Sequence, residues 1–129
     1  MSKDEILLIN DRGEEHSLIS GILAEMNFAL RRADSIAAIA LEARQRLPAA
    51  VILDMDDASV TNRALREIAA GFPGLPVLGI SSQRFHPDLA ESIRYCIYAC
   101  LNRPLDPDEL RYWLRSILRD GPSLEDDTP

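Results

Sequence analysis

The sequence predicts a single α/β domain, a parallel sheet covered by helices on both faces, within a chain of 129 residues. Short apolar runs of strand length recur along the chain, and longer stretches between them repeat their apolar residues at a spacing near 3.6. The short runs lack the strict alternation of polar and apolar residues that a half-exposed strand shows, which favours strands buried on both faces. The pattern therefore indicates five successive β-α units.

The five predicted strands are the short runs of strand length along the chain. Four of them are continuous apolar runs, and the second is a short strand between two predicted helices. In chain order they are Ile6–Ile9, Phe28–Arg32, Val51–Leu53, Val77–Ile80 and Tyr98–Leu101.

The helices are predicted from their apolar spacing and from their end signals. The first carries apolar residues from Leu18 to Met26, and the second carries Ile36, Ile39, Ala40 and Ala43. Asp34-Ser35 can cap the second helix, and Leu47-Pro48 ends it. Pro107 opens the last helix, where two acids follow it at the positive end of the helix dipole. The apolar face of that helix, centred on Trp113, is expected to pack in the core.

Right-handed crossovers leave few topologies for five such units, and we expect the flavodoxin-like strand order 2-1-3-4-5. Residues 1–120 form the predicted domain. The segment 121–129 is an acidic tail with Gly and Pro nearby, and it has too little apolar surface to offset the entropy of ordering it. We therefore expect this tail to be disordered.

The composition excludes several classes of function. Fourteen basic residues against 21 acidic ones give a net charge of −7, which argues against binding to a nucleic acid backbone. The N-terminus lacks the apolar region of a signal peptide, and no apolar run reaches membrane-spanning length, so we expect a cytoplasmic protein with no membrane partner. Cys96 and Cys100 have no histidine partners at metal-ligand spacing and are interpreted as free, buried thiols.

Polar residues follow four of the five predicted strands, the first, third, fourth and fifth, at the edge where ligands bind in this topology. Asp11 and Asp54 end two adjacent central strands, so their carboxylates should repel each other unless a cation or a proton lies between them. Carboxylate oxygens suit Mg²⁺, which keeps several waters when it binds to proteins. The full set at this edge is Asn10, Asp11, Asp54, Asp56, Asp57, Ser81, Ser82, Asn102, Arg103 and Pro104.

Four segments of the chain, taken in order, resemble the receiver domains of bacterial response regulators over about residues 4–120. The resemblance implies that Asp54 accepts a phosphoryl group from a sensor histidine kinase or phosphotransfer protein, and that Ser81 and Arg103 bind that group. It further implies a Mg²⁺ ion held by Asn10, Asp11, Asp54 and the backbone carbonyl of Asp56, and a cis bond before Pro104. The segments are ILLIND, VILDMDD, PVLGISS and LNRPLDPDEL.

The resemblance also implies a phosphoacceptor domain rather than an enzyme, with at most autophosphorylation from small phosphodonors and autodephosphorylation. Its output is expected to pass through a downstream protein. Receiver domains often pair through their fourth and fifth helices and last strand, which here corresponds to Pro87–Asp120. A homodimer through this region is therefore expected as one possible assembly.

The chain departs from the receiver pattern at three positions. Asn10 stands where the family usually has an acid, which weakens the expected Mg²⁺ site. Arg103 replaces the usual lysine and can hold Asp54 in a standing ion pair. Cys100 replaces the usual aromatic switch residue, while Tyr98 is expected to face the other side of the sheet or to lie at the start of the strand. These departures leave a second function open, a pseudo-receiver that signals by protein contact without phosphorylation.

The segment VILDMDDAS also resembles the first motif of haloacid-dehalogenase-type phosphatases. Asp54 would then be the nucleophile and Asp56 the general acid/base. This motif lies on the third predicted strand rather than near the start of the chain, and no suitable downstream lysine and acidic pair follows it. The phosphatase is therefore kept as a remote alternative.

Overall fold

The computed structural model describes residues 4–9, 13–82, 91 and 95–120, and it contains the predicted five-stranded parallel sheet. The order β2-β1-β3-β4-β5 confirms the flavodoxin-like prediction. Each predicted strand boundary differs from the observed one by no more than one residue. The strands are β1 (Glu5–Ile9), β2 (Ala29–Arg32), β3 (Ala50–Asp54), β4 (Val77–Ser81) and β5 (Ala99–Asn102).

The helices begin where the sequence offers capping groups. The Ser35 side chain accepts a hydrogen bond from the backbone N–H of Ala38 at 3.3 Å, and Thr61 caps the next helix in the same way. The helix predicted between β4 and β5 falls largely outside the described residues. The other helices are α1 (Gly13–Glu25), α2 (Ile36–Gln45), α3 (Asn62–Gly71) and α5 (Pro107–Asp120).

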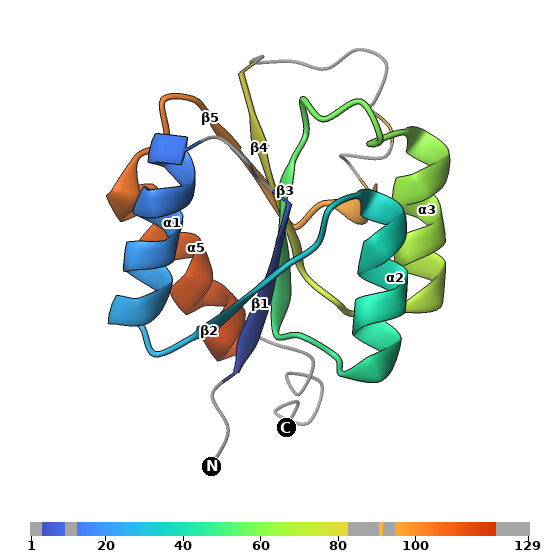
Figure 1. The fold of residues 1–129 in the computed structure, drawn as a ribbon, viewed down its shortest axis with the longest axis horizontal. Coiled ribbons are helices and arrows are strands. Elements are labelled where there is room, and N and C mark those ends of the chain that lie inside the picture. The colour runs from blue at the N-terminus through green and yellow to red at the C-terminus, as the bar shows by residue number, and fades with distance from the viewer. Residues whose placement is uncertain (1–3, 10–12, 83–90, 92–94, 121–129) are drawn as a thin grey trace.

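The two faces of the sheet carry separate apolar cores because successive strand residues point to opposite sides. Helices α1 and α5 cover one face, and α2 and α3 cover the other (Figure 1). In β3, for example, Ile52 belongs to the core under α1 and α5, whereas Leu53 belongs to the core under α2 and α3, and both are fully buried. This two-sided burial explains why the strand sequences lack alternation.

The last helix packs as predicted over most of its apolar face. Leu110, Leu114 and Ile117 are buried, and Trp113 packs against the same core. The Trp113 ring meets that of Tyr98 edge to face, with centroids 5.9 Å apart. Tyr98 therefore lies on the α5 side of the sheet, as expected.

The prediction of buried thiols is wrong. Both cysteines are free, but Cys96 is half-buried and Cys100 is exposed. Cys100 lies in β5, which is an edge strand of the sheet and pairs with β4 alone. An edge position leaves more of a strand open to solvent than the burial on both faces that the apolar run suggested.

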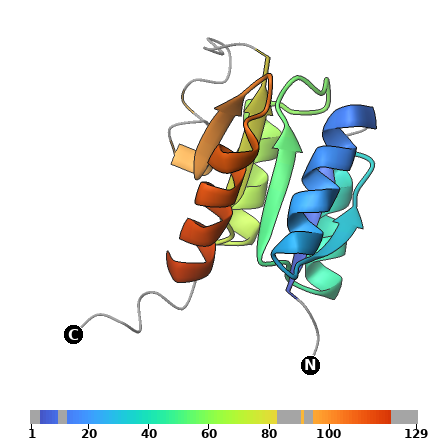
Figure 2. The same cartoon turned by 90° about the vertical axis from the view of Figure 1, so that its left-hand side faces the viewer.

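All five strands are parallel, so their carboxyl ends meet at one edge of the sheet, the upper edge in Figure 1. The register pairs Asp54 with Ile80, and Ser81 with Asn102. The side view in Figure 2 shows β3, β4 and β5 next to one another at this edge. Among the described residues, no helix is long and apolar enough to cross a membrane.

Candidate functional site

Asp54 ends β3, and only 6% of its surface is exposed. Its Oδ1 accepts a hydrogen bond from the backbone N–H of Asp56 at 3.0 Å, which fixes the carboxylate relative to the following loop. Beyond Asp54, the Met55 N–H donates to the carbonyl of Ile80 at 2.8 Å and keeps the backbone attached to β4. The chain thus carries a buried carboxylate to the open edge of the sheet and holds it in one orientation.

Arg103 follows β5 and reaches across the same edge. Its backbone N–H donates to the Ser81 carbonyl at 2.9 Å, and the peptide bond to Pro104 is cis, as the family resemblance implied. Its side chain is 10% exposed and contacts three carboxylates from two segments of the chain, the first turn of α1 and the end of β3. Nη2 lies 3.0 Å from Asp54 Oδ1 and 2.8 Å from Glu15 Oε1, Nε lies 2.9 Å from Glu15 Oε2, and Nη1 lies 2.5 Å from Asp56 Oδ2.

We call this group, Glu15, Asp54, Asp56 and Arg103, the Arg103 cluster. Among the described residues it combines three carboxylates with one guanidinium, which gives a formal charge of −2 when all are ionised. Burial alone lowers the pKa of Arg103, but hydrogen bonds and Coulombic attraction to Glu15 and Asp54 raise it above its ordinary value. Arg103 therefore remains a fixed cation, and the cluster keeps surplus negative charge.

The structure brings several predicted site residues together. Asp54 and Arg103 form the ion pair that the sequence suggested, and Ser81 is fully buried at the end of the neighbouring strand β4. Asp56 joins the cluster through its side chain, which also accepts a hydrogen bond from the Ser82 N–H at 2.9 Å. The predicted metal ligands Asn10 and Asp11 lie outside the described residues.

Glu15 was not predicted as a site residue. It lies in the first turn of α1, 88 positions from Arg103, and it resembles any acid at the positive end of a helix. The adjacent acids Glu14 and Glu15, in the first turn of the helix that follows β1, were the available signal. The sequence does not show which of the two turns toward Arg103.

The carboxylate oxygens of the Arg103 cluster suit a magnesium ion only in part. Carboxylate oxygens are the ligands that Mg²⁺ prefers, and the surplus negative charge would favour a divalent cation. However, the Arg103 guanidinium already lies between three of these carboxylates. Within the described residues, which omit Asn10 and Asp11, no group of three or more His, Cys, Asp or Glu side chains is arranged to hold a metal ion.

The position of the usual aromatic switch is packed differently here. Cys100 pairs in register with Gly79, and the Met55 side chain lies over this glycine. A Cβ added to Gly79 would be 2.8 Å from Met55 Cγ and 3.1 Å from its Sδ. The absence of a side chain at Gly79 therefore provides the space that Met55 fills, directly after the candidate phosphoacceptor.

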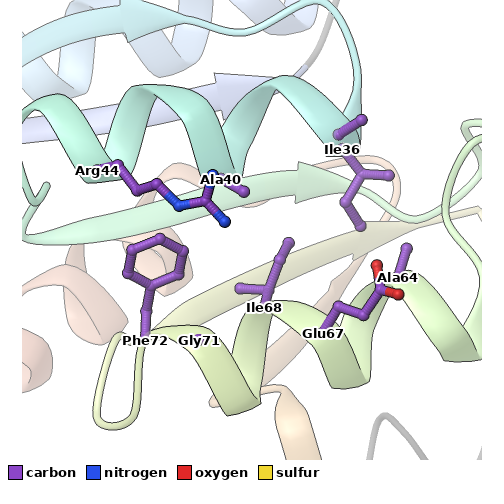
Figure 3. Close-up of a pocket in the computed structure, with 9 residues that line it drawn as sticks. Ile36, Ala40, Arg44, Ala64, Glu67, Ile68, Gly71 and Phe72 are labelled. Carbon is purple, nitrogen blue, oxygen red and sulfur yellow. The ribbon is translucent and has the colours of Figure 1, made fainter.

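A separate hollow of about 520 Å³ lies between α2 and α3. It is lined mainly by small and apolar side chains, with Arg44 and Phe72 at one end and Ile36 and Ala64 at the other (Figure 3). Its lining includes none of the Arg103 cluster, so this hollow is separate from the candidate site.

Comparison with known proteins shows which solved structures share the fold of this chain. No protein-family model matches the chain, and no curated protein matches it either. Solved structures do match. The receiver domain of a sensor histidine kinase from Pseudomonas aeruginosa PAO1, described with a magnesium ion coordinated in its active site cleft, has a TM-score of 0.76 at 19% identity, covering 92% of this chain and 99% of that one.

Two further solved structures also match the fold of this chain. The signal receiver domain of an HD domain-containing protein from Pseudomonas fluorescens Pf-5 gives a TM-score of 0.78 at 21% identity, with 91% of this chain and 95% of that chain covered. NtrX from Brucella abortus, in complex with ADP, gives 0.75 at 26% identity and 91% coverage of this chain. This chain spans 26% of that NtrX chain.

The strand order, the polar edge and these neighbours define the class. The chain has the fold of a response regulator receiver domain, and the recognition made from four sequence segments is confirmed at that level.

Proposed function

We propose that this chain is a phosphorelay receiver in which Asp54 accepts a phosphoryl group from a histidine kinase or phosphotransfer protein. The observation that carries the proposal is the placement of Asp54. It is a nearly buried carboxylate at the carboxyl end of a central strand, with a guanidinium nitrogen 3.0 Å from Oδ1. A nucleophile beside a fixed cation is the arrangement that phosphoryl transfer needs.

In the proposed reaction a carboxylate oxygen of Asp54 attacks phosphorus and forms an acyl phosphate. The P–N bond of a phosphohistidine breaks, and the histidine leaves with the bonding electron pair; with acetyl phosphate a P–O bond breaks and acetate leaves. Arg103 would bind the phosphoryl oxygens, since a guanidinium pairs with phosphate through parallel hydrogen bonds. The buried Ser81 hydroxyl is the proposed second donor.

When bound, Mg²⁺ would neutralise the crowded oxygens of Asp54 and the phosphoryl group. Its proposed ligands are Asp54, Asn10, Asp11 and the Asp56 carbonyl. We expect weak binding, because Asn10 replaces an acid and Arg103 already supplies positive charge to Asp54 and Asp56.

Intact mass after incubation with Mg²⁺ and acetyl phosphate tests the proposal. The wild type should gain one phosphoryl group through an acid-stable, base-labile bond, and Asp54→Asn should gain none. Absence of any gain in the wild type, under conditions that modify a control receiver, would overturn the assignment of Asp54.

One observation favours a second candidate, the pseudo-receiver that signals without phosphorylation. All three guanidinium nitrogens of Arg103 already contact carboxylates, so the group expected to bind phosphate is engaged at rest. In that case Asp54→Asn would leave binding to the partner protein unchanged. The phosphatase alternative and the cytoplasmic location stay predictions, as does the division into a domain of residues 1–120 and a tail of 121–129.

We also propose a downstream protein partner, and a homodimer through the region 87–120. Tyr112 and Leu118 on α5 are 56% and 51% exposed, more than a purely internal helix would leave. Tyr112→Glu together with Leu118→Glu should shift a dimer to monomer in light scattering after size exclusion. An unchanged mass would place the dimer contact elsewhere.

A further inference from the structure

Glu15 binds the guanidinium of Arg103 along one whole edge. Its two carboxylate oxygens accept from Nε at 2.9 Å and from Nη2 at 2.8 Å, which is the parallel two-bond geometry of a strong arginine–carboxylate pair. The side chains are 12% and 10% exposed, so solvent competes little for these bonds. Glu15 comes from the first turn of α1, outside the strands that carry Asp54 and Arg103.

A phosphoryl group would approach Arg103 with the same bonding needs as this carboxylate. Arginine pairs with phosphate through two parallel N–H···O bonds, as it does with a carboxylate. The Nε and Nη2 edge holds Glu15, while Nη1 contacts Asp56 and Nη2 also contacts Asp54. Glu15 therefore occupies one of the two edges of Arg103 that offer two parallel donors to an anion, and Asp54 and Asp56 contact the nitrogens of the other edge.

The negative charge of Glu15 also opposes the binding of a phosphoryl group, as its position on Arg103 does. With Glu15 ionised, the Arg103 cluster has a formal charge of −2 among the described residues, which repels an anionic phosphodonor. Removing the charge of Glu15 leaves −1 and gives Arg103 a larger share of uncompensated positive charge. Both changes favour the approach of a phosphoryl anion to Asp54.

We propose that Glu15 is a positioning residue, an internal anion that holds Arg103, so that a phosphoryl group can use the Nε/Nη2 edge of Arg103 only after displacing Glu15. The inference rests on the proposed function of Asp54 and adds a regulation of its pocket. Its consequence is a receiver with low intrinsic reactivity, which rises when the first turn of α1 moves away from Arg103. A kinase docked on that turn would raise it in this way.

The test compares Glu15→Gln with the wild type and with Glu25→Gln. Glu25 lies at the other end of α1, about 15 Å along the helix, and makes the same forked pair with Arg111 at 2.8 and 3.2 Å, but in an exposed setting. The first measurement is the dissociation constant for inorganic phosphate, followed through the Arg103 Nε–H signal in NMR. The second is the initial rate of phosphorylation by acetyl phosphate, followed by intact mass.

We expect Glu15→Gln to tighten phosphate binding and to raise the phosphorylation rate by about tenfold, the lower end of electrostatic effects on the association of ions. Glu25→Gln should match the wild type in both. Arg103→Lys is the second variant should Glu15→Gln fold poorly, because an ammonium cannot be held by two parallel bonds, and it should also raise the rate.

If neither measurement changes in a folded Glu15→Gln protein, or if the phosphorylation rate does not rise in a folded Arg103→Lys protein, the inference is overturned. A Glu15→Gln protein that only loses thermal stability overturns it as well, since Glu15 is then merely structural. If phosphate binds more tightly but no variant gains a phosphoryl group, the role of Glu15 stands and the proposed function of Asp54 fails.

Discussion

Two groups of charged side chains at opposite edges of the sheet differ in their balance. At the start of β1, Arg31 contacts Glu5 and Glu42, and Arg46 lies 3.1 Å from Glu5. This Arg31 cluster joins β1, β2 and α2 with two acids and two bases, so its formal charge is zero within the described residues. The Arg103 cluster, at the carboxyl edge, has three acids and one base.

From this difference in charge balance we infer a structural role for the Arg31 cluster and a functional role for the Arg103 cluster. A balanced cluster satisfies its own charges and needs nothing further to hold the strands and the helix together. Surplus charge in a nearly buried cluster is destabilising, because like charges repel where water screens them poorly. Such a surplus brings no benefit to stability, so we interpret the negative charge at the carboxyl edge as retained for binding a cation.

The largest expected effect comes from removing each central arginine. Arg103→Ala leaves three clustered carboxylates without their guanidinium and should lower the free energy of unfolding by about 3–5 kcal/mol. Arg31→Ala should cost less, about 2 kcal/mol, because Glu42 is partly exposed and Arg46 still pairs with Glu5. Urea unfolding measures both.

Adding Mg²⁺ to these unfolding measurements distinguishes the two clusters further. Millimolar Mg²⁺ should restore part of the stability of Arg103→Ala, since a ligand that binds only the folded state stabilises it. It should not restore Arg31→Ala. A larger loss in Arg31→Ala than in Arg103→Ala would contradict the contrast between the two clusters.

Neutralising one acid in each cluster should give changes of opposite sign. Asp56→Asn reduces the surplus charge and can keep the bond from the Ser82 N–H, so stability should stay level or rise by up to about 1 kcal/mol. Glu5→Gln unbalances the Arg31 cluster and should lose about 1–2 kcal/mol. Urea midpoints at neutral pH compare the two, and equal losses would show that charge balance is not the relevant property.

The reactivity of the Cys100 thiol measures the surplus negative charge of the Arg103 cluster in the folded protein. Although Cys100 is an exposed residue, partial desolvation of its thiol first, and the Asp56 carboxylate second, raise the pKa of this thiol. Because the thiolate is the reactive form, Asp56→Asn should speed alkylation of Cys100 by iodoacetamide at pH 8 by about threefold. Glu5→Gln, at the far edge, is the control. Peptide mapping by mass spectrometry gives the rates, and no increase in Asp56→Asn would mean that the field of the cluster does not reach β5.

The smallest effect concerns the exposed pair on α1 and α5. The hydrogen bond from Arg111 lowers the pKa of Glu25 below its ordinary value of 4.5. The stabilisation of the folded state by the Glu25 carboxylate is therefore fully present above the ordinary pKa, and it is lost as the pH falls through the lower pKa of Glu25 in the folded state. Glu25→Gln should be slightly less stable than the wild type at pH 7 and should match it in strong acid. A difference that persists in strong acid would mean that it does not arise from this charge.

The fold was predictable because it depends on local signals that agree with one another. Apolar runs, the Ser35 cap and Pro107 fix the elements, and the parallel βα order leaves few topologies. The pairing of Asp54 with Arg103 also followed, since both residues end strands of the same sheet.

The remainder of the site depends on side-chain directions that only tertiary contacts determine. Asp56 was expected to act through its backbone carbonyl, yet its carboxylate meets Arg103, and Glu15 was not predicted at all. The presence of arginine at 103 is itself a weak signal, because Lys3 is the only lysine among the 14 basic residues of the chain. What distinguishes Arg103 is the set of carboxylates that it contacts.

Met55 fills the space left by the missing side chain of Gly79. An alanine at 79 would require Met55 to move, which couples the two positions. A side chain at 79 becomes acceptable once position 55 carries a shorter residue. We therefore expect homologues to keep the Met-Gly pair or to exchange both residues together.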